Sequence, residues 1–229
     1  MKKLEDIVFL FDCDNTLLDN DGVQGDLKAH LTSEFGVAEN DRYWALYEKL
    51  RLEVGYADYL GAMQLFRLGA QSDPRMLQLG SFLLDYPFAM RLYPGALDAI
   101  GHCGRWGPTV ILSDGDAVLQ PRKLQRAGLW DAVDGRVLIY VHKEQMLEEM
   151  MRRFAARHYV MVDDKLRVLS AMKGIIKERL STIFPRQGHY ALDAAVIAAY
   201  PPADLTVDRI GDLIGYDFAT LPAMAKTRQ

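Results

Sequence analysis

The 229-residue sequence predicts an α/β fold, in which a parallel β-sheet lies between two layers of helices. Three observations support this prediction. Short, continuous apolar runs recur along the chain, as expected for strands that are buried on both faces of a parallel sheet. Helical patterns separate most of these runs. Several runs also stop abruptly at an acidic or hydroxyl side chain, which is typical of strands that lead into a ligand site.

The first expected strand covers residues 7–11 and stops at Asp12. Later strands are expected at residues 109–112, 137–141, 159–162 and 182–184, with a short sixth at 205–207. A helix over residues 144–157 is predicted from its apolar stripe, and Pro94 and Gly95 open another helix that carries Leu97 and Ile100. We expect both stripes to pack in the core. The residues of the first stripe are Met146, Leu147, Met150, Met151 and Phe154.

Between the first two strands, residues 22–92 show no strand-like alternation. Four helical segments are expected there, at 23–35, 42–54, 59–68 and 74–84. Asp41, Asp58 and Asp73 stand where N-caps are expected, and Pro74 suits a first helical turn. Because this block is too long for a simple crossover, we expect a helical insertion over the edge of the sheet. The predicted division is a core of residues 1–20 and 91–229 and an insertion of residues 21–90.

The overall composition is that of a soluble globular protein with ample apolar residues for a buried core. Half of the residues are hydrophobic, a quarter are charged and the formal net charge is -4. Since the basic residues are scattered, no nucleic-acid partner is expected. Cys13 and Cys103 lack the spacing of a disulfide framework or zinc site, which favours a cytoplasmic location. The apolar stretch 191–200 contains Asp193 and is too short to span a bilayer, so no membrane partner is expected. No pattern indicates the oligomeric state.

The residues that follow the apolar runs are unusually rich in chemical groups. Because the carboxyl ends of parallel strands meet at one edge of a sheet, we expect these groups to converge. The first strand leads to Asp12, Asp14 and Thr16, the second to Ser113, Asp114 and Gly115, the third to Lys143, and the fourth to Asp163 and Asp164.

Carboxylates crowded at one edge would repel one another unless a cation joined them. Oxygen ligands favour Mg²⁺, and the absence of nearby His or Cys, apart from Cys13, argues against zinc. Lys143, Ser113 and the backbone N–H groups of Asp114 and Gly115 are expected to supply donors to a dianionic group such as phosphate. The sequence therefore predicts a site for a metal and a phosphate.

Four segments in this order resemble the motifs of the haloacid dehalogenase superfamily. They read FLFDCDNTLLDND, TVILSDG, YVHKE and YVMVDDK. The resemblance covers residues 7–18 and about 92–217, whereas the insertion matches the family's cap only in position and helical character. It implies a three-layer α/β/α, Rossmann-like core with a helical-bundle cap domain.

The resemblance also implies a role for each site residue. Asp12 would be the nucleophile that forms an aspartyl phosphate, and Asp14 the general acid and base. Mg²⁺ would be held by Asp12, the backbone carbonyl of Asp14, and Asp164 with help from Asp163, although the last two roles could be exchanged. Ser113 and Lys143 would hold the phosphoryl group, and Lys143 would offset the charge of Asp12. Thr16, Asp114 and Gly115 complete the expected substrate side of the site.

These roles favour a Mg²⁺-dependent phosphatase that acts on a small phosphorylated metabolite. A phosphomutase would use the same aspartyl phosphate and is the nearest alternative. A receiver-like phosphate switch is disfavoured by the insertion and by the pattern of Asp14 and Thr16. Dehalogenation is disfavoured because the superfamily's dehalogenases lack an acid at the position of Asp14. The substrate itself is not predicted.

Overall fold

A six-stranded parallel sheet forms the centre of the computed structural model, which describes residues 4–69 and 71–218. The strand order is β3-β2-β1-β4-β5-β6. The strands are β1 (Glu5–Phe11), β2 (Thr109–Asp114), β3 (Val137–Tyr140), β4 (Ala156–Val162), β5 (Leu180–Pro185) and β6 (Leu205–Val207). The predicted α/β fold is confirmed, and each predicted strand is present.

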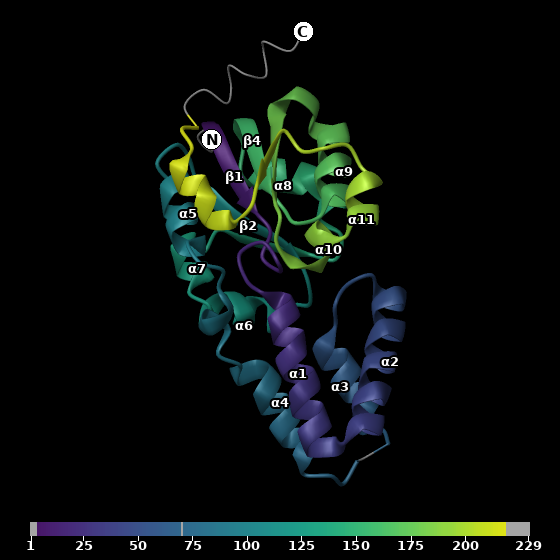
Figure 1. Cartoon of the computed structure of the whole chain (residues 1–229). Helices are drawn as coiled ribbons and strands as arrows, with labels where there is room; N and C mark the ends of the chain where they lie inside the picture. Colours follow the sequence, from purple (N-terminus) through teal and green to yellow (C-terminus); the bar gives the residue numbers. More distant parts are fainter. Residues whose placement is uncertain (1–3, 70, 219–229) are drawn as a thin grey trace.

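Helices cover both faces of the sheet because successive side chains of each strand point in opposite directions. In β1, Phe9 and Phe11 join one buried cluster, whereas Val8 and Leu10 join the other. The first cluster includes residues of α5 (Ala96–Cys103), α6 (Leu119–Arg126), α7 (Leu129–Ala132) and η4 (Ile210–Gly215). The second includes residues of α8 (Leu147–Arg153), α9 (Leu166–Ile176) and α10 (Gly188–Leu192), and α11 (Ala194–Ala198) packs at its edge. Both layers are visible in Figure 1.

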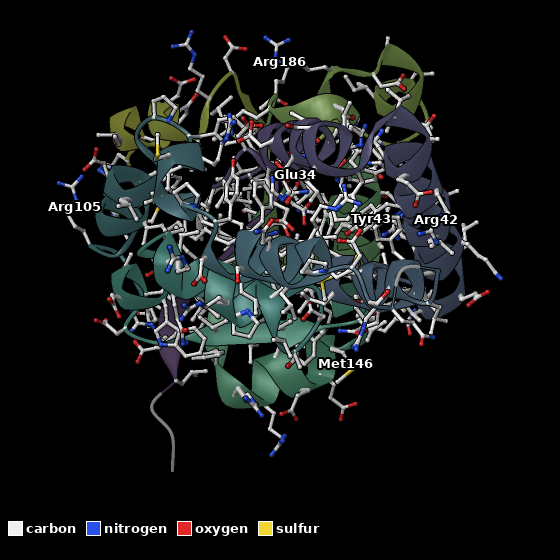
Figure 2. The ribbon with its side chains drawn as sticks, turned by 90° about the horizontal axis from the view of Figure 1, so that it is seen from below. Glu34, Arg42, Tyr43, Arg105, Met146 and Arg186 are labelled. Carbon is white, nitrogen blue, oxygen red and sulfur yellow. The ribbon has the colours of Figure 1, made fainter. Side chains whose placement is uncertain are left out.

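Four helices stand beyond the carboxyl ends of the strands, at the lower end of the molecule in Figure 1. They are α1 (Asn20–Phe35), α2 (Val37–Val54), α3 (Tyr59–Arg67) and α4 (Arg75–Asp85), and we call residues 20–85 the helical insertion. Tyr43 lies among these helices in Figure 2 and is fully buried. The insertion returns to the core through η1 (Phe88–Arg91). Its buried residues form one continuous cluster with those on one face of the sheet.

Three of the predicted helix starts in the insertion need correction. Asp41 is not an N-cap, because α2 already begins at Val37 and leaves Asp41 exposed inside the helix. A single residue, Gly36 with φ of 89°, separates α1 from α2, so no room remains for a longer loop. The start of α1 also lies earlier than predicted, with Asp19 as the N-cap that accepts a bond from the Gly22 amide at 2.9 Å. The N-cap of α4 is Pro74 and not Asp73, and this helix begins at Arg75. Asp58 is confirmed as the N-cap of α3.

The predicted helix over residues 144–157 is broken into two shorter elements. Lys143–Gln145 forms the 3-10 helix η2, and α8 follows from Leu147. Met146 lies at the joint and is 38% exposed, near the rim of the molecule in Figure 2, so its assignment to the core was wrong. Leu97 is likewise exposed, whereas Ile100 is buried as expected. The remaining short 3-10 element is η3 (Lys177–Arg179).

None of the helices in the described part of the chain is long and apolar enough to cross a membrane.

Candidate active site

The order of the strands places a crevice beside β1. The chain adds β2 and β3 on one side of β1 and then returns to add β4 on the other. In open parallel sheets this reversal is where ligands bind, because the segments leaving the two neighbouring strands diverge. Phe11 and Val162 are direct partners at the ends of β1 and β4, so the residues that follow them, Asp12 and Asp163, emerge side by side.

Three buried carboxylates gather at this crevice. Asp12, Asp163 and Asp164 each offer an oxygen, and these oxygens all lie within 4.8 Å of one another. Asp12 is 3% exposed and the other two are fully buried. Within the described residues, Oδ2 of Asp12 and both carboxylate oxygens of Asp164 have no hydrogen-bond partner. Leaving buried carboxylate oxygens without a partner is costly, which is the pattern expected where a hard cation completes the site.

The acidic cluster is partly neutralised by Lys143, which is 1% exposed. Its Nζ contacts Asp12 Oδ1, lies 2.7 Å from Asp163 Oδ2, and donates to the Leu112 carbonyl at 3.3 Å. Burial lowers the pKa of Lys143, but the nearby carboxylates raise it by more, so the net pKa is raised and the ammonium stays charged. Sequence and structure thus agree that Lys143 faces Asp12.

One lysine still leaves the cluster short of positive charge. Burial raises the pKa of Asp163 and that of Asp164, despite the opposing effects of Lys143 and Lys165. Lys165, for which the sequence suggested no role, follows this acidic pair and has its own pKa raised because the attraction of the acids exceeds the effect of burial. Thr16 holds the backbone here, since its Oγ1 accepts a bond from the Asp164 amide at 3.0 Å.

The residues at the end of β2 and directly after it, Ser113, Asp114 and Gly115, make different contacts. Ser113 is buried, and its Oγ accepts a bond from Gln120 Nε2 at 3.0 Å. Asp114 fixes the backbone of Lys143 by accepting its amide at 2.7 Å, and burial raises the pKa of Asp114 to about 6. The amide of Gly115, however, donates to the Tyr140 carbonyl at 2.9 Å. The predicted phosphate-binding role of this N–H was wrong, because it continues the ladder between β2 and β3.

Asp14 is anchored separately from Asp12. Its side chain is 21% exposed, and Oδ1 accepts a bond from Lys123 Nζ at 2.7 Å. Lys123 lies on α6 and is buried, with its pKa raised because attraction to Asp14 outweighs the lowering effect of burial. Sequence reasoning missed this lysine, since it lies in a helix rich in polar residues, LQPRKLQR, and follows no strand end.

A tight turn connects Asp14 to the helical insertion. Asn15, with φ of 61°, accepts bonds from the amides of Asn20 and Asp21 at 3.0 and 3.1 Å. The loop after β5 braces the same turn, because Gln187 Nε2 donates to the Thr16 carbonyl at 3.1 Å. The turn therefore holds Asp14 and the start of α1 in one fixed arrangement.

A cavity of about 670 Å³ opens between the helical insertion and the core. Tyr56 lines it from the insertion, Asp116 from the segment after β2, Tyr140 from the end of β3 and His142 from the segment after β3. Gly115 also lines it, directly after Asp114. The cavity is large enough for a small metabolite and borders the segments that carry Ser113 and Lys143.

Comparison with known families gives a match over residues 8–175 to the family described as haloacid dehalogenase-like hydrolase. This chain belongs to that family. It is accordingly a hydrolase of the haloacid dehalogenase-like type, as the four motifs indicated. Among curated proteins, no significant match is found.

Solved structures include one similar family member, a haloacid dehalogenase-like hydrolase from Burkholderia xenovorans LB400. It is 64% identical, with a TM-score of 0.88, and the match covers 93% of this chain and 99% of that one. Two more distant solved structures share the fold alone. The L-2-haloacid dehalogenase of Xanthobacter autotrophicus, with chloropropionic acid covalently bound, is 18% identical with a TM-score of 0.59, covering 91% and 96% of the two chains. A magnesium-bound HAD-hydrolase from Bacillus subtilis is 14% identical with a TM-score of 0.61, covering 92% and 98%.

Proposed function

We propose that this hydrolase removes the phosphate from a small phosphorylated metabolite, through an aspartyl phosphate at Asp12 and with the help of Mg²⁺. The observation that carries the proposal is the presence of a second carboxylate, Asp14, two residues after Asp12, which belongs to the buried acidic cluster. The helical insertion would act as the cap that covers the substrate in the adjoining cavity.

Asp14 is what favours phosphate esters over haloacids. A departing halide is a weak base and leaves without a proton, whereas a departing alkoxide is strongly basic and needs an acid beside it. Asp14 is partly exposed and so can reach a substrate, unlike the fully buried Asp163 and Asp164. An acid at this place has a use in ester cleavage and none in halide displacement.

The reaction would proceed in two balanced steps. An oxygen of Asp12 attacks the phosphorus, the bond from phosphorus to the leaving oxygen breaks, and Asp14 gives that oxygen its proton. Asp14 then takes a proton from water, which attacks the phosphorus and breaks the bond to Asp12, releasing inorganic phosphate. Of the two Asp12 oxygens, Oδ1 faces Lys143 and Oδ2 has no partner within the described residues, so Oδ2 is the better candidate for attack or metal binding.

The residues present fit a hard divalent cation. Asp12, Asp164 and, in support, Asp163 would hold it by their side chains, and Asp14 by its backbone carbonyl. Bound Mg²⁺ would screen the charge of the phosphate from that of Asp12. Lys143 would neutralise the remaining charge on Asp12, and Ser113 would donate to a phosphate oxygen. The amide of Asp114 stays a proposed donor, whereas that of Gly115 does not.

The test is a panel of metabolite phosphates with Mg²⁺, together with p-nitrophenyl phosphate and 2-chloropropionate. We expect phosphate release and no chloride release. Asp12→Asn should lower kcat for phosphate release by about 10³-fold or more, because it removes the nucleophile. Chloride release that depends on Asp12, without phosphate release from any ester, would reverse the assignment in favour of a dehalogenase.

Asp14→Asn should also suppress phosphate release, but its stability must be measured at the same time. This substitution leaves the buried Lys123 without its anionic partner, which can cost about 3–5 kcal/mol. The double variant Asp14→Asn with Lys123→Met removes that cost and serves as the matched control. Conversion of a sugar phosphate to an isomer without free phosphate would instead identify a mutase.

A further inference from the structure

Lys123 has no part in the chemistry described so far, although it is one of the most deeply buried charged groups in the protein. Its side chain is 2% exposed. Nζ donates to Asp14 Oδ1 at 2.7 Å and to Asn20 Oδ1 at 3.0 Å. Burying an ammonium costs several kcal/mol unless it is paired and hydrogen-bonded. Asp14 and Asn20 supply these partners, so the position of Lys123 depends on both of them.

Lys123 is placed to act on Asp14 and not on the substrate. The cavity that it lines together with Asn20 and Tyr59 has a volume of about 10 Å³, which is close to the size of one water and far below that of a metabolite. The large cavity of about 670 Å³ is lined by other residues. The contact of Lys123 with Asp14 fixes the direction of the Asp14 carboxylate. The neighbouring Asp12 is held by a different lysine, Lys143, from a different element.

The contact continues into the helical insertion. Asn20, the first residue of α1, donates from Nδ2 to the hydroxyl of Tyr59 on α3 at 3.3 Å. Gln24 also donates to this hydroxyl, at 2.9 Å. The Tyr59 ring is stacked on that of Tyr47, with the centroids 4.9 Å apart. A chain of buried polar contacts thus runs from α3 through Asn20 and Lys123 to Asp14.

We infer that Lys123 is a positioning residue for Asp14, and that the helical insertion sets its place through Asn20 and Tyr59. The inference rests on the proposed function, since it concerns the delivery of a proton by Asp14. When the insertion is seated as in this structure, the carboxylate of Asp14 is held in one orientation at the substrate.

The effect of losing Lys123 on the rate of cleavage should therefore depend on the leaving group. A general acid matters greatly when a strongly basic alkoxide departs and little when the weakly basic p-nitrophenolate departs. Loss of the positioning residue should therefore damage the cleavage of alkyl phosphates much more than that of p-nitrophenyl phosphate. A residue that only supports the fold would affect both substrates equally.

The experiment compares kcat/KM of Lys123→Met on the best alkyl phosphate of the panel and on p-nitrophenyl phosphate. This parameter reports the step in which the leaving group departs. Methionine keeps the apolar stem, and Asp14 can be hydrated because it is partly exposed, so the variant is expected to fold. We expect a loss of about 10²-fold for the alkyl phosphate and less than about 10-fold for p-nitrophenyl phosphate. Tyr59→Phe should show the same inequality at smaller size.

Lys173→Met is the matched control, because Lys173 also pairs with an aspartate, Asp204, but lies on α9 away from the site. It should leave the ratio of the two kcat/KM values unchanged. Equal losses for both substrates in Lys123→Met, or no loss in either, would overturn the inference while leaving the phosphatase proposal intact. If Lys123→Met does not fold, Tyr59→Phe decides by the same ratio. An unmodified enzyme that hydrolyses no phosphate ester would refute the proposed function, and the inference with it.

Discussion

At the scale of single residues, the two carboxylates of the first motif depend on two different lysines. Lys143, which follows β3, faces Asp12, whereas Lys123, on α6, bonds to Asp14. Only one residue, Cys13, separates the two acids in the chain, so a shared counter-ion would have tied their charges together. In the proposed mechanism, separate anchors would let the nucleophile Asp12 and the general acid Asp14 be held in place independently.

Gly188 is a residue at which a small change should disturb this arrangement. It has φ of +71°, and an added Cβ would lie 2.4 Å from Cβ of Asn15, the residue that shapes the turn after Asp14. We expect Gly188→Ala to lower the free energy of unfolding by about 1–3 kcal/mol, because both the backbone conformation and the contact are unfavourable. Denaturant unfolding of the variant and of the unmodified protein measures this difference in free energy.

The control for this prediction is Gly25→Ala. Gly25 lies inside α1, and nothing lies within 4 Å of its expected Cβ. Alanine there should raise the free energy of unfolding by about 0.5–1 kcal/mol. Equal effects of the two substitutions would mean that the close approach of Gly188 to Asn15 does not exist in solution.

At the scale of elements, the carboxylate of Asp204 links α9, β5 and the segment that leads into β6. Asp204 Oδ2 lies 2.6 Å from Lys173 Nζ of α9 and accepts bonds from the amide and hydroxyl of Thr182 on β5 at 2.9 and 3.1 Å. Burial raises the pKa of Asp204, but these bonds lower it by more, so the net pKa is below the usual value. The last strand, β6, follows directly and is positioned by this contact.

This pKa shift predicts how stability depends on pH. Because the pKa of Asp204 is lower in the folded state than in the unfolded state, its stabilising effect is present above the unfolded pKa and is lost as the pH falls through the folded pKa. We expect Asp204→Asn to lower the free energy of unfolding by about 1 kcal/mol at pH 7. The effect is modest because the Asp204 side chain is 32% exposed and solvent screens its charge. The difference from the unmodified protein should shrink below about pH 4.

Thermal unfolding of the two proteins across this pH range tests the prediction. Asp208→Asn is the comparison, because Asp208 pairs with Arg186 on the exposed surface and should contribute less than about 0.5 kcal/mol. A difference for Asp204→Asn that stays constant from pH 7 to pH 3 would contradict the linkage.

At the scale of the whole molecule, the helical insertion leaves the core shortly after Asp12, one of the three clustered buried acids. The apolar residues of the insertion and of the core form one continuous cluster, so the helical insertion is packed onto the core and not merely tethered to it. The carboxylates of Asp12, Asp163 and Asp164 lie where this packing meets the sheet, and their crowding opposes folding.

A divalent cation should therefore stabilise the entire fold. At a Mg²⁺ concentration of about one hundred times the Kd, binding adds about 2.7 kcal/mol to the free energy of unfolding. For a chain of this size that raises Tm by about 5–10 °C. Differential scanning fluorimetry with Mg²⁺ and with EDTA measures the shift, and Asp164→Asn should remove most of it. An unchanged Tm in Mg²⁺ at every concentration would argue against a cation at this cluster.

Much of the site was predictable because parallel strands impose a simple geometry. An apolar run that ends at an acid places that acid at the carboxyl edge of the sheet, and this reasoning located Asp12, Ser113, Asp163 and Asp164. The order of the motifs did the same for Lys143. The side chains of all five are buried at that edge.

Other features were decided only by the tertiary structure. Lys123 reaches Asp14 because α6 packs beside the turn after β1, and no local pattern in a polar helix signals such a contact. The amide of Gly115 is engaged because β2 and β3 stay paired beyond the predicted strand end, which is a matter of register. The sequence by itself thus determined which groups carry the proposed chemistry, since these groups stand where the apolar runs end. Packing between distant segments decided how Asp14 is oriented, because a long side chain finds its partner only when the helices are in place.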